Sequence, residues 1–433
     1  MPVHVLAAIL TILVLWSPTT NLHAQAPERR PSSPVFGAPD PRQSPEEGLD
    51  GGLTVTGSVF GGYDNSLFIG PGLGTPLQAH SRSRDSHTGF SGQLLYDRPG
   101  DHLSLRGGLS GSGRYYPGLE RFVVGRQSAD LVSSSGMSPW RGAHLATSGM
   151  ARYSRYGGPF AGAAFLPQDF PLDMFDGDNA VRLRRSDSLL GHVQLEQDWG
   201  RRKSLAILAG VQSSGLEGSE RAEGYELGGA LTSNVTRYGT VRAGYTRQQM
   251  DRGAARYVVH LLNIGGNYGR PVSASRRTFV TVGGGSAVLE SNGQAHLQAI
   301  ANAALQHEFG RSWRGSARYH RGFMFLDELA GPLMSDGLVA ELNGLLTRRL
   351  ELLGSGSFTH GTIGLSPSAT PYNAYSAHTQ VRYALSRVAA VYAEYVLFNY
   401  RFAESVRLGA GLPSYFDRQT VRVGVTVRTD LFR

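Results

Sequence analysis

Apolar and polar residues alternate with a period of two through most of this chain, and no other feature constrains its fold as strongly. The last such segment places Val421, Val423, Val425 and Val427 on one parity and Arg422, Gly424, Thr426 and Arg428 on the other. Alternate side chains of a strand lie on opposite faces, so each segment has one apolar face and one polar face. Helical spacing fits none of these segments. The pattern therefore predicts an all-β protein.

About 18 segments carry this pattern, and nearly all are 11–16 residues long. They lie near 53–63, 86–97, 102–115, 122–137, 141–156, 186–199, 203–214, 222–236, 239–249, 257–268, 277–288, 294–309, 313–325, 337–347, 350–362, 374–386, 388–400 and 418–431. Strands of globular proteins are most often about 5–6 residues long, whereas a tilted bilayer crossing needs about 9–11. The lengths favour membrane-crossing strands. A count of 16 is the alternative.

The connections between these segments are of two kinds. Tight turns lie at 98–101, 138–141, 199–203, 236–239, 347–350 and around Ser386. Longer connections, rich in glycine, proline and acidic residues, lie at 64–85, 157–185, 325–337, 362–373 and 401–417. Short periplasmic turns that alternate with longer external loops are typical of outer-membrane barrels. The turn at 269–276 is the longest exception.

A strand exposed to lipid must pair all its backbone groups, which only a closed barrel achieves. With this alternation and these connections, residues 53–433 resemble the bacterial outer-membrane β-barrels of the porin type. The resemblance is one of architecture, and no motif identifies a subfamily. It implies a transmembrane antiparallel up-and-down barrel of about 18 strands, with 16 as the alternative, in the outer membrane of a Gram-negative bacterium. A secreted solenoid or propeller would have shorter strands and a motif of fixed period.

The chain begins with features of an exported protein. A 12-residue apolar run, 5–16, is too short to span a bilayer as a helix, and the small residues Ala24 and Ala26 flank Gln25 as in a signal-peptidase site. We therefore expect 1–26 to be a signal peptide that directs Sec-type export and is cleaved after Ala26. The proline-rich segment 27–52 contains little that is apolar, and we expect it to be a flexible periplasmic segment.

The composition excludes several classes of protein. The chain has no cysteine, so it has no disulfide scaffold, iron–sulfur cluster, thiol catalysis or lipoprotein anchor. Glycine supplies 57 of the 433 residues, nearly twice the share of about 7% in ordinary globular proteins. The formal net charge is +8, and Lys203 is the only lysine. The arginines are spread along the chain, at most as adjacent pairs, rather than in blocks, which argues against nucleic acid as a partner.

The polar faces of the segments carry most of the candidate functional residues, which we expect to line the channel. These are Arg106, Arg152, Arg242, Arg314, Arg318, Arg382, Arg422, Arg428, Glu196, Glu226, Glu341 and Glu394. Arginines that line a pore favour anions, and facing charges of opposite sign orient polar solutes. The alternative is that the arginines brace adjacent strands and cross-link the wall.

The longest connection, 157–185, is the third external loop, and in general porins this loop folds inward and narrows the pore. Its acidic residues are Asp169, Asp173, Asp176 and Asp178. The resemblance implies a constriction loop that carries these four carboxylates. The alternative is a solvated surface loop, with its phenylalanines packed over the mouth of the barrel.

Aromatic and small residues give information on the membrane surface of the barrel. Trp140, Trp199 and Trp313 all fall at proposed periplasmic ends of strands and are expected to form an interface girdle with outer-membrane lipid. Small residues within 297–305 permit a homotrimer. The terminal segment 421–433 resembles the signal by which such barrels engage the barrel-assembly machinery. In this chain Phe432 is penultimate, and Leu431 keeps the apolar parity.

The sequence therefore predicts a porin-like channel for passive diffusion of small hydrophilic solutes, with a mild anion preference. The alternatives are a structural or export-associated barrel without a channel and, less favoured, an outer-membrane hydrolase. We expect no enzymatic activity and no cofactor, because the chain contains no GxSxG, HExxH, GxGxxG or P-loop motif. The 13 histidines are scattered without a recognised metal-ligand spacing, so no metal site is expected.

Overall fold

The computed structural model of this chain is an antiparallel β-sheet of 18 strands that closes on itself. The structure describes residues 52–67, 83–98, 100, 103–140, 143–155, 186–199, 202–216, 220–236, 239–253, 255–268, 278–291, 294–309, 312–325, 332–363, 370–402 and 415–432. The predicted signal peptide and all but the last residue of the proline-rich segment 27–52 lie outside these ranges.

The strands are long and follow one another directly along the chain. They are β1 Gly52–Leu67, β2 Ser83–Arg98, β3 Leu103–Tyr116, β4 Arg121–Trp140, β5 Ala143–Arg155, β6 Ser186–Trp199, β7 Lys203–Leu216, β8 Ala222–Asn234, β9 Gly239–Arg252, β10 Ala255–Tyr268, β11 Thr278–Ser291, β12 Gln294–Phe309, β13 Trp313–Phe325, β14 Pro332–Leu345, β15 Leu350–Ile363, β16 Thr370–Ala384, β17 Ala389–Phe402 and β18 Tyr415–Phe432. The predicted all-β class and the count of 18 are confirmed. A 3₁₀ turn, η1 Pro117–Leu119, joins β3 to β4. Among the described residues, no helix is long and apolar enough to span a membrane.

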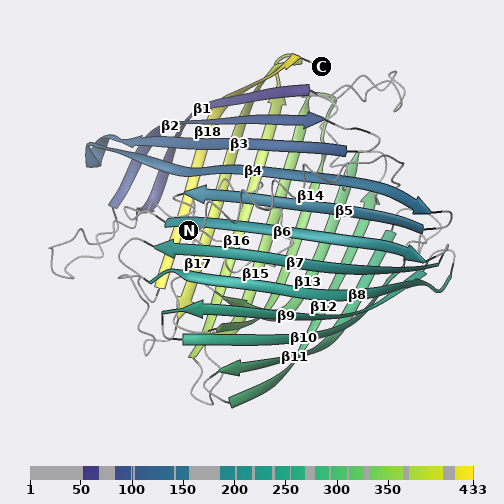
Figure 1. Cartoon of the computed structure of the whole chain (residues 1–433). Coiled ribbons are helices and arrows are strands. Elements are labelled where there is room, and N and C mark those ends of the chain that lie inside the picture. Colours follow the sequence, from purple (N-terminus) through teal and green to yellow (C-terminus); the bar gives the residue numbers. More distant parts are fainter. Residues whose placement is uncertain are drawn as a thin grey trace.

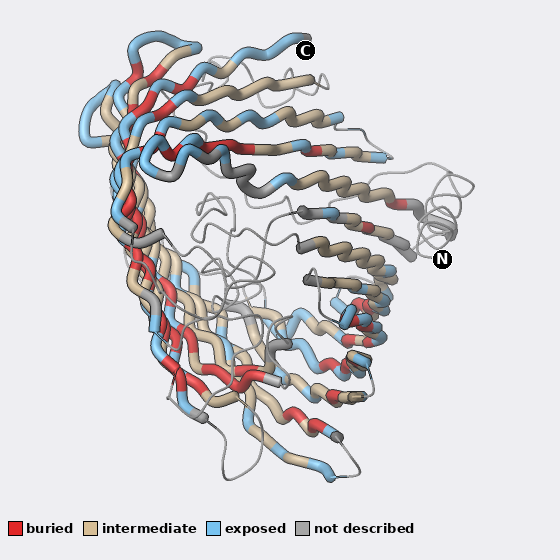
Figure 2. The backbone as a smooth tube through the Cα atoms, turned by 90° about the vertical axis from the view of Figure 1, so that its left-hand side faces the viewer, coloured by how far each residue is buried: buried red, intermediate tan, exposed pale blue. Residues whose placement is uncertain are grey.

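The barrel closes where the first and last strands pair. Every consecutive pair of strands is antiparallel and hydrogen-bonded, and β1 pairs with β18 as well as with β2. In Figure 1 the strands of the near wall cross the direction of those of the far wall, as tilted strands do in a barrel. Figure 2 shows the wall as a single layer of strands around a central axis. Closure pairs the two edges that an open sheet would expose.

The two faces of the wall differ in chemistry and in exposure. On β18, the valines at 421, 423, 425 and 427 are exposed, whereas Arg418, Thr420, Arg422 and Thr426 are buried. The same alternation along β17 buries Tyr392, Glu394, Val396 and Phe398. Buried and exposed stretches accordingly alternate along the strands in Figure 2. The exposed apolar side chains form the outer, lipid-facing surface, and the polar side chains face the interior.

The tight turns are built by side chains that bind the backbone of the next residues. The Thr347 hydroxyl accepts hydrogen bonds from the backbone N–H groups of Arg349 and Leu350, between β14 and β15. Ser386 accepts equivalent bonds from Val388 and Ala389, between β16 and β17. Such Ser/Thr motifs replace backbone partners in a turn. At the other end of the wall, Gly253 turns β9 into β10 with a φ of 55°, which favours glycine.

Several strands extend beyond the bounds predicted from alternation. The connection predicted at 325–337 is partly wrong, because β14 begins at Pro332, and the turn predicted at 138–141 is partly wrong because β4 continues to Trp140. The outer face near the start of β14 carries Asp336, which binds Arg321 on the outer face of β13. Polar residues occupy both parities there, so the alternation disappears although the strand continues.

We predict that an arginine on the outer face destabilises the barrel according to its depth. Val423 lies in the middle of β18 and is 60% exposed, so Val423→Arg should lower the free energy of unfolding by about 2–4 kcal/mol. Thr429→Arg, on the same face near the end of the strand, should lower it by only about 0–1 kcal/mol. Urea unfolding in phospholipid vesicles measures both. Equal effects of the two substitutions would contradict a lipid-facing outer surface.

Candidate functional site

The strand register places the candidate lumen residues on one face of the wall. Directly opposite residues of an antiparallel pair share a face, so the inner face can be followed from strand to strand, starting with the buried Arg422 opposite Glu394. This face carries Arg106, Arg242, Arg314, Arg318, Arg382, Arg422, Arg428, Glu196, Glu226, Glu341 and Glu394. Arg152 has the same register, opposite Asp130, but its side chain is not among those described. That these residues line a conducting path stays a prediction.

Most of these arginines bind an acidic residue on a neighbouring strand. Arg318 on β13 lies 2.6 Å from Glu341 on β14, and Arg314 lies 3.0 Å from Glu308 on β12. Two further pairs join Arg106 to Asp97 at 2.7 Å and Arg382 to Glu351 at 3.5 Å. Asp97, Glu308 and Glu351 were not singled out in the sequence. Bracing of adjacent strands, the alternative for the arginines, therefore accounts for these contacts.

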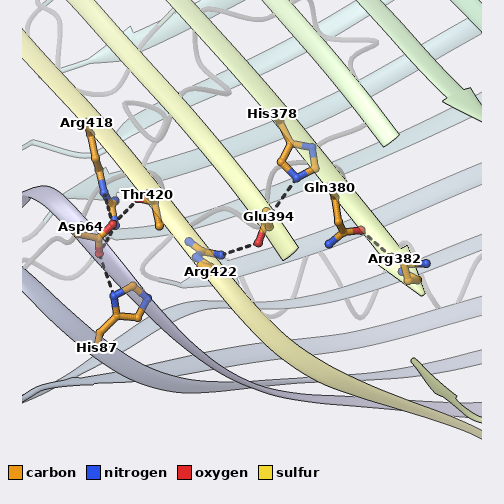
Figure 3. A network of polar contacts seen from close by, with 9 residues as sticks. All are labelled: Asp64, His87, His378, Gln380, Arg382, Glu394, Arg418, Thr420 and Arg422. Atoms are coloured by element: carbon orange, nitrogen blue, oxygen red, sulfur yellow. Dashed lines mark hydrogen bonds and ion pairs between the residues drawn. The ribbon is translucent and has the colours of Figure 1, made fainter. Parts of the chain in front are cut away.

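The most buried group of charges lies at the seam between the first and last strands (Figure 3). Asp64 on β1 is fully buried, and Arg418 on β18 donates to both of its carboxylate oxygens, from Nη2 at 3.1 and 3.0 Å. Tyr116 on β3 donates to Asp64 Oδ2 at 2.8 Å, and Thr420 donates to Oδ1. His87 Nδ1 on β2 lies 3.4 Å from Oδ2. One carboxylate thus joins four strands.

A second carboxylate extends this seam cluster to β17 and β16. Glu394 Oε1 lies 2.9 Å from Nε2 of His378, and Glu394 Oε2 lies 3.6 Å from Nη1 of Arg422 (Figure 3). All three side chains are buried. Each of the two carboxylates lies beside an arginine of β18, and this compensates charges that water does not reach. We define the seam cluster as Asp64, His87, Tyr116, Arg418, Thr420, Arg422, Glu394 and His378.

The ring of Phe60 lies beside two arginines of this region. The guanidinium carbons of Arg422 and Arg114 lie 5.5 and 5.9 Å from the ring centroid. Cations over an aromatic face gain more when they are desolvated. Gly424 and Gly89 leave room for this ring, because a Cβ at either position would lie less than 3 Å from a Phe60 atom. The phenylalanine ring is thus a neighbour of two buried arginines.

Aromatic side chains continue the inner face from the seam cluster along β17. Phe398, Tyr400 and Phe402 follow one another at every second position, and Tyr372 of β16 stacks on Phe402 with centroids 5.7 Å apart. All four are buried. This part of the inner wall is therefore apolar and covered, in contrast to the charged pairs on β12 to β14.

The predicted girdle residues lie at one end of the barrel. Trp199 ends β6 and Trp313 begins β13, so antiparallel pairing places them at the same end, and Trp199 is half exposed. Trp140 ends β4 at this end too, but its side chain is not described. Exposed tyrosines gather near the opposite end, and the sequence analysis missed them: Tyr63, Tyr115, Tyr153, Tyr225, Tyr375 and Tyr415. The interface role of both groups remains a prediction.

The predicted constriction loop lies outside the part of the chain that the structure describes. This holds for Asp169, Asp173, Asp176 and Asp178 and for all of 157–185. Among the described part of the chain, no group of three or more His, Asp or Glu side chains could hold a metal ion.

The sequence analysis recognised only Glu394 and Arg422 of the seam cluster. Asp64 falls just beyond the predicted segment 53–63, and its partner Arg418 lies 354 positions away. The sequence did contain one signal. Arg418 begins the last alternating segment, and Asp64 and Arg418 both have the parity of the inner face of their strands.

We predict that removing one charge of the seam cluster destabilises the barrel strongly. Asp64→Asn leaves the buried guanidinium of Arg418 without its anion and should lower the free energy of unfolding by about 3–5 kcal/mol. Asp97→Asn is the matched control, because the Asp97–Arg106 pair is nearly half exposed and should contribute about 0.2–1 kcal/mol. Urea unfolding in vesicles measures both. Similar losses would show that the buried pair has no special role in stability.

Comparison with known proteins gives likenesses of fold at low sequence identity. No protein-family model matches the chain, and no curated protein matches it. Among solved structures, OpdL of Pseudomonas aeruginosa is similar with 12% identity and a TM-score of 0.44, covering 88% of this chain and 99% of that one. OccAB3 of Acinetobacter baumannii is similar with 10% identity and a TM-score of 0.41, covering 88% and 100%. The alcaligin outer-membrane receptor FauA of Bordetella pertussis is similar with 11% identity and a TM-score of 0.34, covering 87% and 76%.

The architecture itself is plain from the geometry. A closed antiparallel barrel of 18 long strands with an apolar, exposed outer face and a polar inner face is a transmembrane barrel. The resemblance to outer-membrane barrels of the porin type is confirmed at this level.

Proposed function

We propose that this barrel is a porin-like channel for the passive diffusion of small hydrophilic solutes. The observation that carries the proposal is the inner face, which presents paired charges on β2–β3 and on β12–β16. Barrels of 16–18 strands are wide enough to leave an aqueous channel. Ion pairs fixed on opposite sides of such a channel orient polar solutes and exclude apolar ones. We propose that the protein has no enzymatic activity.

We further propose a mild anion preference. Most inner arginines have their charge compensated by a neighbouring carboxylate, so they contribute little net field. Arg242 differs, since its register partners are Thr232 and Gly265, and it is exposed. Arg428 lies opposite Thr56. These two arginines supply the uncompensated positive charge. The acidic third loop, 157–185, is proposed to fold inward and oppose them.

A second candidate function rests on the burial of the seam cluster. A side chain that faces an open aqueous lumen is exposed, yet Asp64, His87, Arg418 and Arg422 are at most 2% exposed. This favours a barrel whose lumen is occluded along the seam and whose role is structural or associated with export. The two candidates differ in a single measurable property, the conductance of the inserted barrel.

Export and assembly complete the proposal. Residues 1–26 are proposed to be a signal peptide removed after Sec-type export, and 27–52 a periplasmic segment before the barrel domain 53–433. The barrel-assembly machinery is proposed to engage β18, because this strand closes the barrel by pairing with β1. A homotrimer is proposed through the outer face of 297–305, where three alanines lie between Leu297 and Leu305 on the same parity.

The test is the conductance of the refolded full-length protein in planar bilayers under a potassium chloride gradient. We expect a steady conductance and a reversal potential that shows weak anion selectivity. Arg242→Glu with Arg428→Glu should reverse the selectivity, because it replaces the uncompensated positive charges by negative ones.

Lys203→Glu is the control, since Lys203 lies on the outer face and should leave the selectivity unchanged. A barrel that inserts but does not conduct would support the occluded alternative. Cation selectivity of the unmodified protein would contradict the proposed arginine field.

A further inference from the structure

The wall of the barrel is split between β12 and β13 over part of its height. Pairing of these strands runs from Phe309 opposite Trp313 to Ala301 opposite Arg321 and ends there. Residues 294–300 of β12 continue as strand and remain paired with β11, but not with β13. Leu297 on the outer face of this stretch is 70% exposed, as expected when no neighbouring strand covers it. The split lies at the end of the barrel opposite Trp313.

Three glycines of β11 lie at the height where the split begins. On β11, Gly283, Gly284 and Gly285 lie opposite Asn302, Ala301 and Ile300 of β12. Asn302 and Ala301 are the last residues of β12 to pair with β13, and Ile300 is the first without a register partner there. A Cβ on Gly285 would overlap the backbone of β10, at the carbonyl of Leu262. Only glycine permits so close an approach of two strands. This close approach of β10 and β11 lies at the height where β12 loses its pairing with β13 but keeps its pairing with β11.

An apolar cluster lies behind the split, on the inner side. Its centre is formed by Val259, Ala287 and Leu289, each fully buried, and Ile300 of β12 and Phe323 of β13 pack against it. By parity Phe323 belongs to the outer face, as Trp313 does. Met334, opposite Phe323 on β14, is also buried, although Leu338 on the same face is half exposed. Phe323 therefore fills the space between the separated strands.

A charged side chain bridges the mouth of the split. Arg321 Nε donates to the backbone carbonyl of Ala299 at 3.2 Å, and Ala299 has no register partner in the β12–β13 pairing. Its Nη1 binds both carboxylate oxygens of Asp336 at 3.2 and 3.1 Å, and Tyr319 donates to the same carboxylate at 2.6 Å. An unpaired strand edge does not persist in lipid without such a substitute. The guanidinium is over a third exposed and can be reached by a second anion.

We propose that this split is a lateral binding site for a single-chain anionic amphiphile, entered from the outer surface of the barrel. The hydrocarbon chain replaces Phe323 against the apolar cluster, and the anionic head binds the guanidinium of Arg321 in competition with Asp336. The lipid-facing position of Leu297 and the continuity of the outer apolar surface up to the split point to a membrane-borne ligand. The site is independent of the proposed diffusion of hydrophilic solutes along the barrel axis, and it is an alternative to the proposed homotrimer, whose contact through 297–305 would cover Leu297.

The first test examines the split itself by disulfide formation. The chain has no native cysteine, so any disulfide must involve the introduced residues. Leu305→Cys with Ala317→Cys joins two outer-face residues that are directly opposite, and should cross-link under mild oxidation. Ala299→Cys with Phe323→Cys continues the same register beyond Ala301 and should not cross-link. Equal cross-linking of both pairs in the folded barrel would show an unbroken wall and overturn the proposal.

The second test measures binding of stearate that carries a spin label near its methyl end, in phospholipid vesicles containing the full-length barrel. We expect an immobilised component in the electron paramagnetic resonance spectrum. Arg321→Gln should weaken this binding about tenfold through loss of one charge-assisted contact, and Arg321→Lys should restore part of it. Phe323→Ala should strengthen binding, because it removes the phenyl ring that the hydrocarbon chain of stearate must displace.

The matched control is Phe358→Ala, which removes an exposed outer-face phenylalanine from the continuous part of the wall and should change nothing. Heat-dependent gel migration verifies that each variant is folded. If stearate binds equally to the unmodified barrel, Arg321→Gln and Phe323→Ala, the label reports general lipid contact and the lateral site does not exist.

Discussion

The pairing of β1 with β18 is the constraint on which the rest of this structure depends. In hydrocarbon each unpaired backbone group is costly, so an all-β chain of this kind is stable only when the sheet has no free edge. The seam meets this requirement with a register that runs from Leu53 to Asp64. The buried charges at the seam then add side-chain bonds to the backbone bonds, from β3 across to β16. The most buried ion pairs of the inner face thus lie where the barrel is joined.

The same constraint explains the bridge at the split between β12 and β13. Where β12 loses its neighbour, a guanidinium takes the place of a strand and binds the carbonyl of Ala299. Arg321 is itself held by Asp336, so the substitute is positioned rather than free. The seam and the split therefore both supply hydrogen-bond partners to a strand edge that lipid would otherwise leave unpaired. At the seam the backbone closes the sheet, and at the split a side chain and an apolar plug close it.

The sequence was sufficient for the fold because lipid on one side and a polar interior on the other impose a period of two. It predicted the number of strands and the face of residues such as Arg318 and Glu341. It did not predict their partners, because a slip of two residues between strands leaves every face unchanged and alters every ion pair. The contact of Asp64 with Arg418 depends on a register between strands 354 positions apart, which no local pattern contains. The glycine run at 283–285 was visible in the sequence, but its position beside the end of the β12–β13 pairing required the neighbouring strands.

The position of the seam cluster has a consequence for the order of folding. Asp64 is made near the start of the described chain and Arg418 near its end, so their contact has one of the longest sequence separations available to the molecule. Contacts of this kind form late, because the entropy of closing so long a loop is lost before the contact is gained. Until β18 arrives, the carboxylate of Asp64 has Tyr116, His87 and the charge of Arg114 nearby, but it lacks Arg418, which donates to both of its oxygens. The ion pair between Asp64 and Arg418 therefore forms only when the wall is completed. Its presence distinguishes a finished barrel from an open sheet.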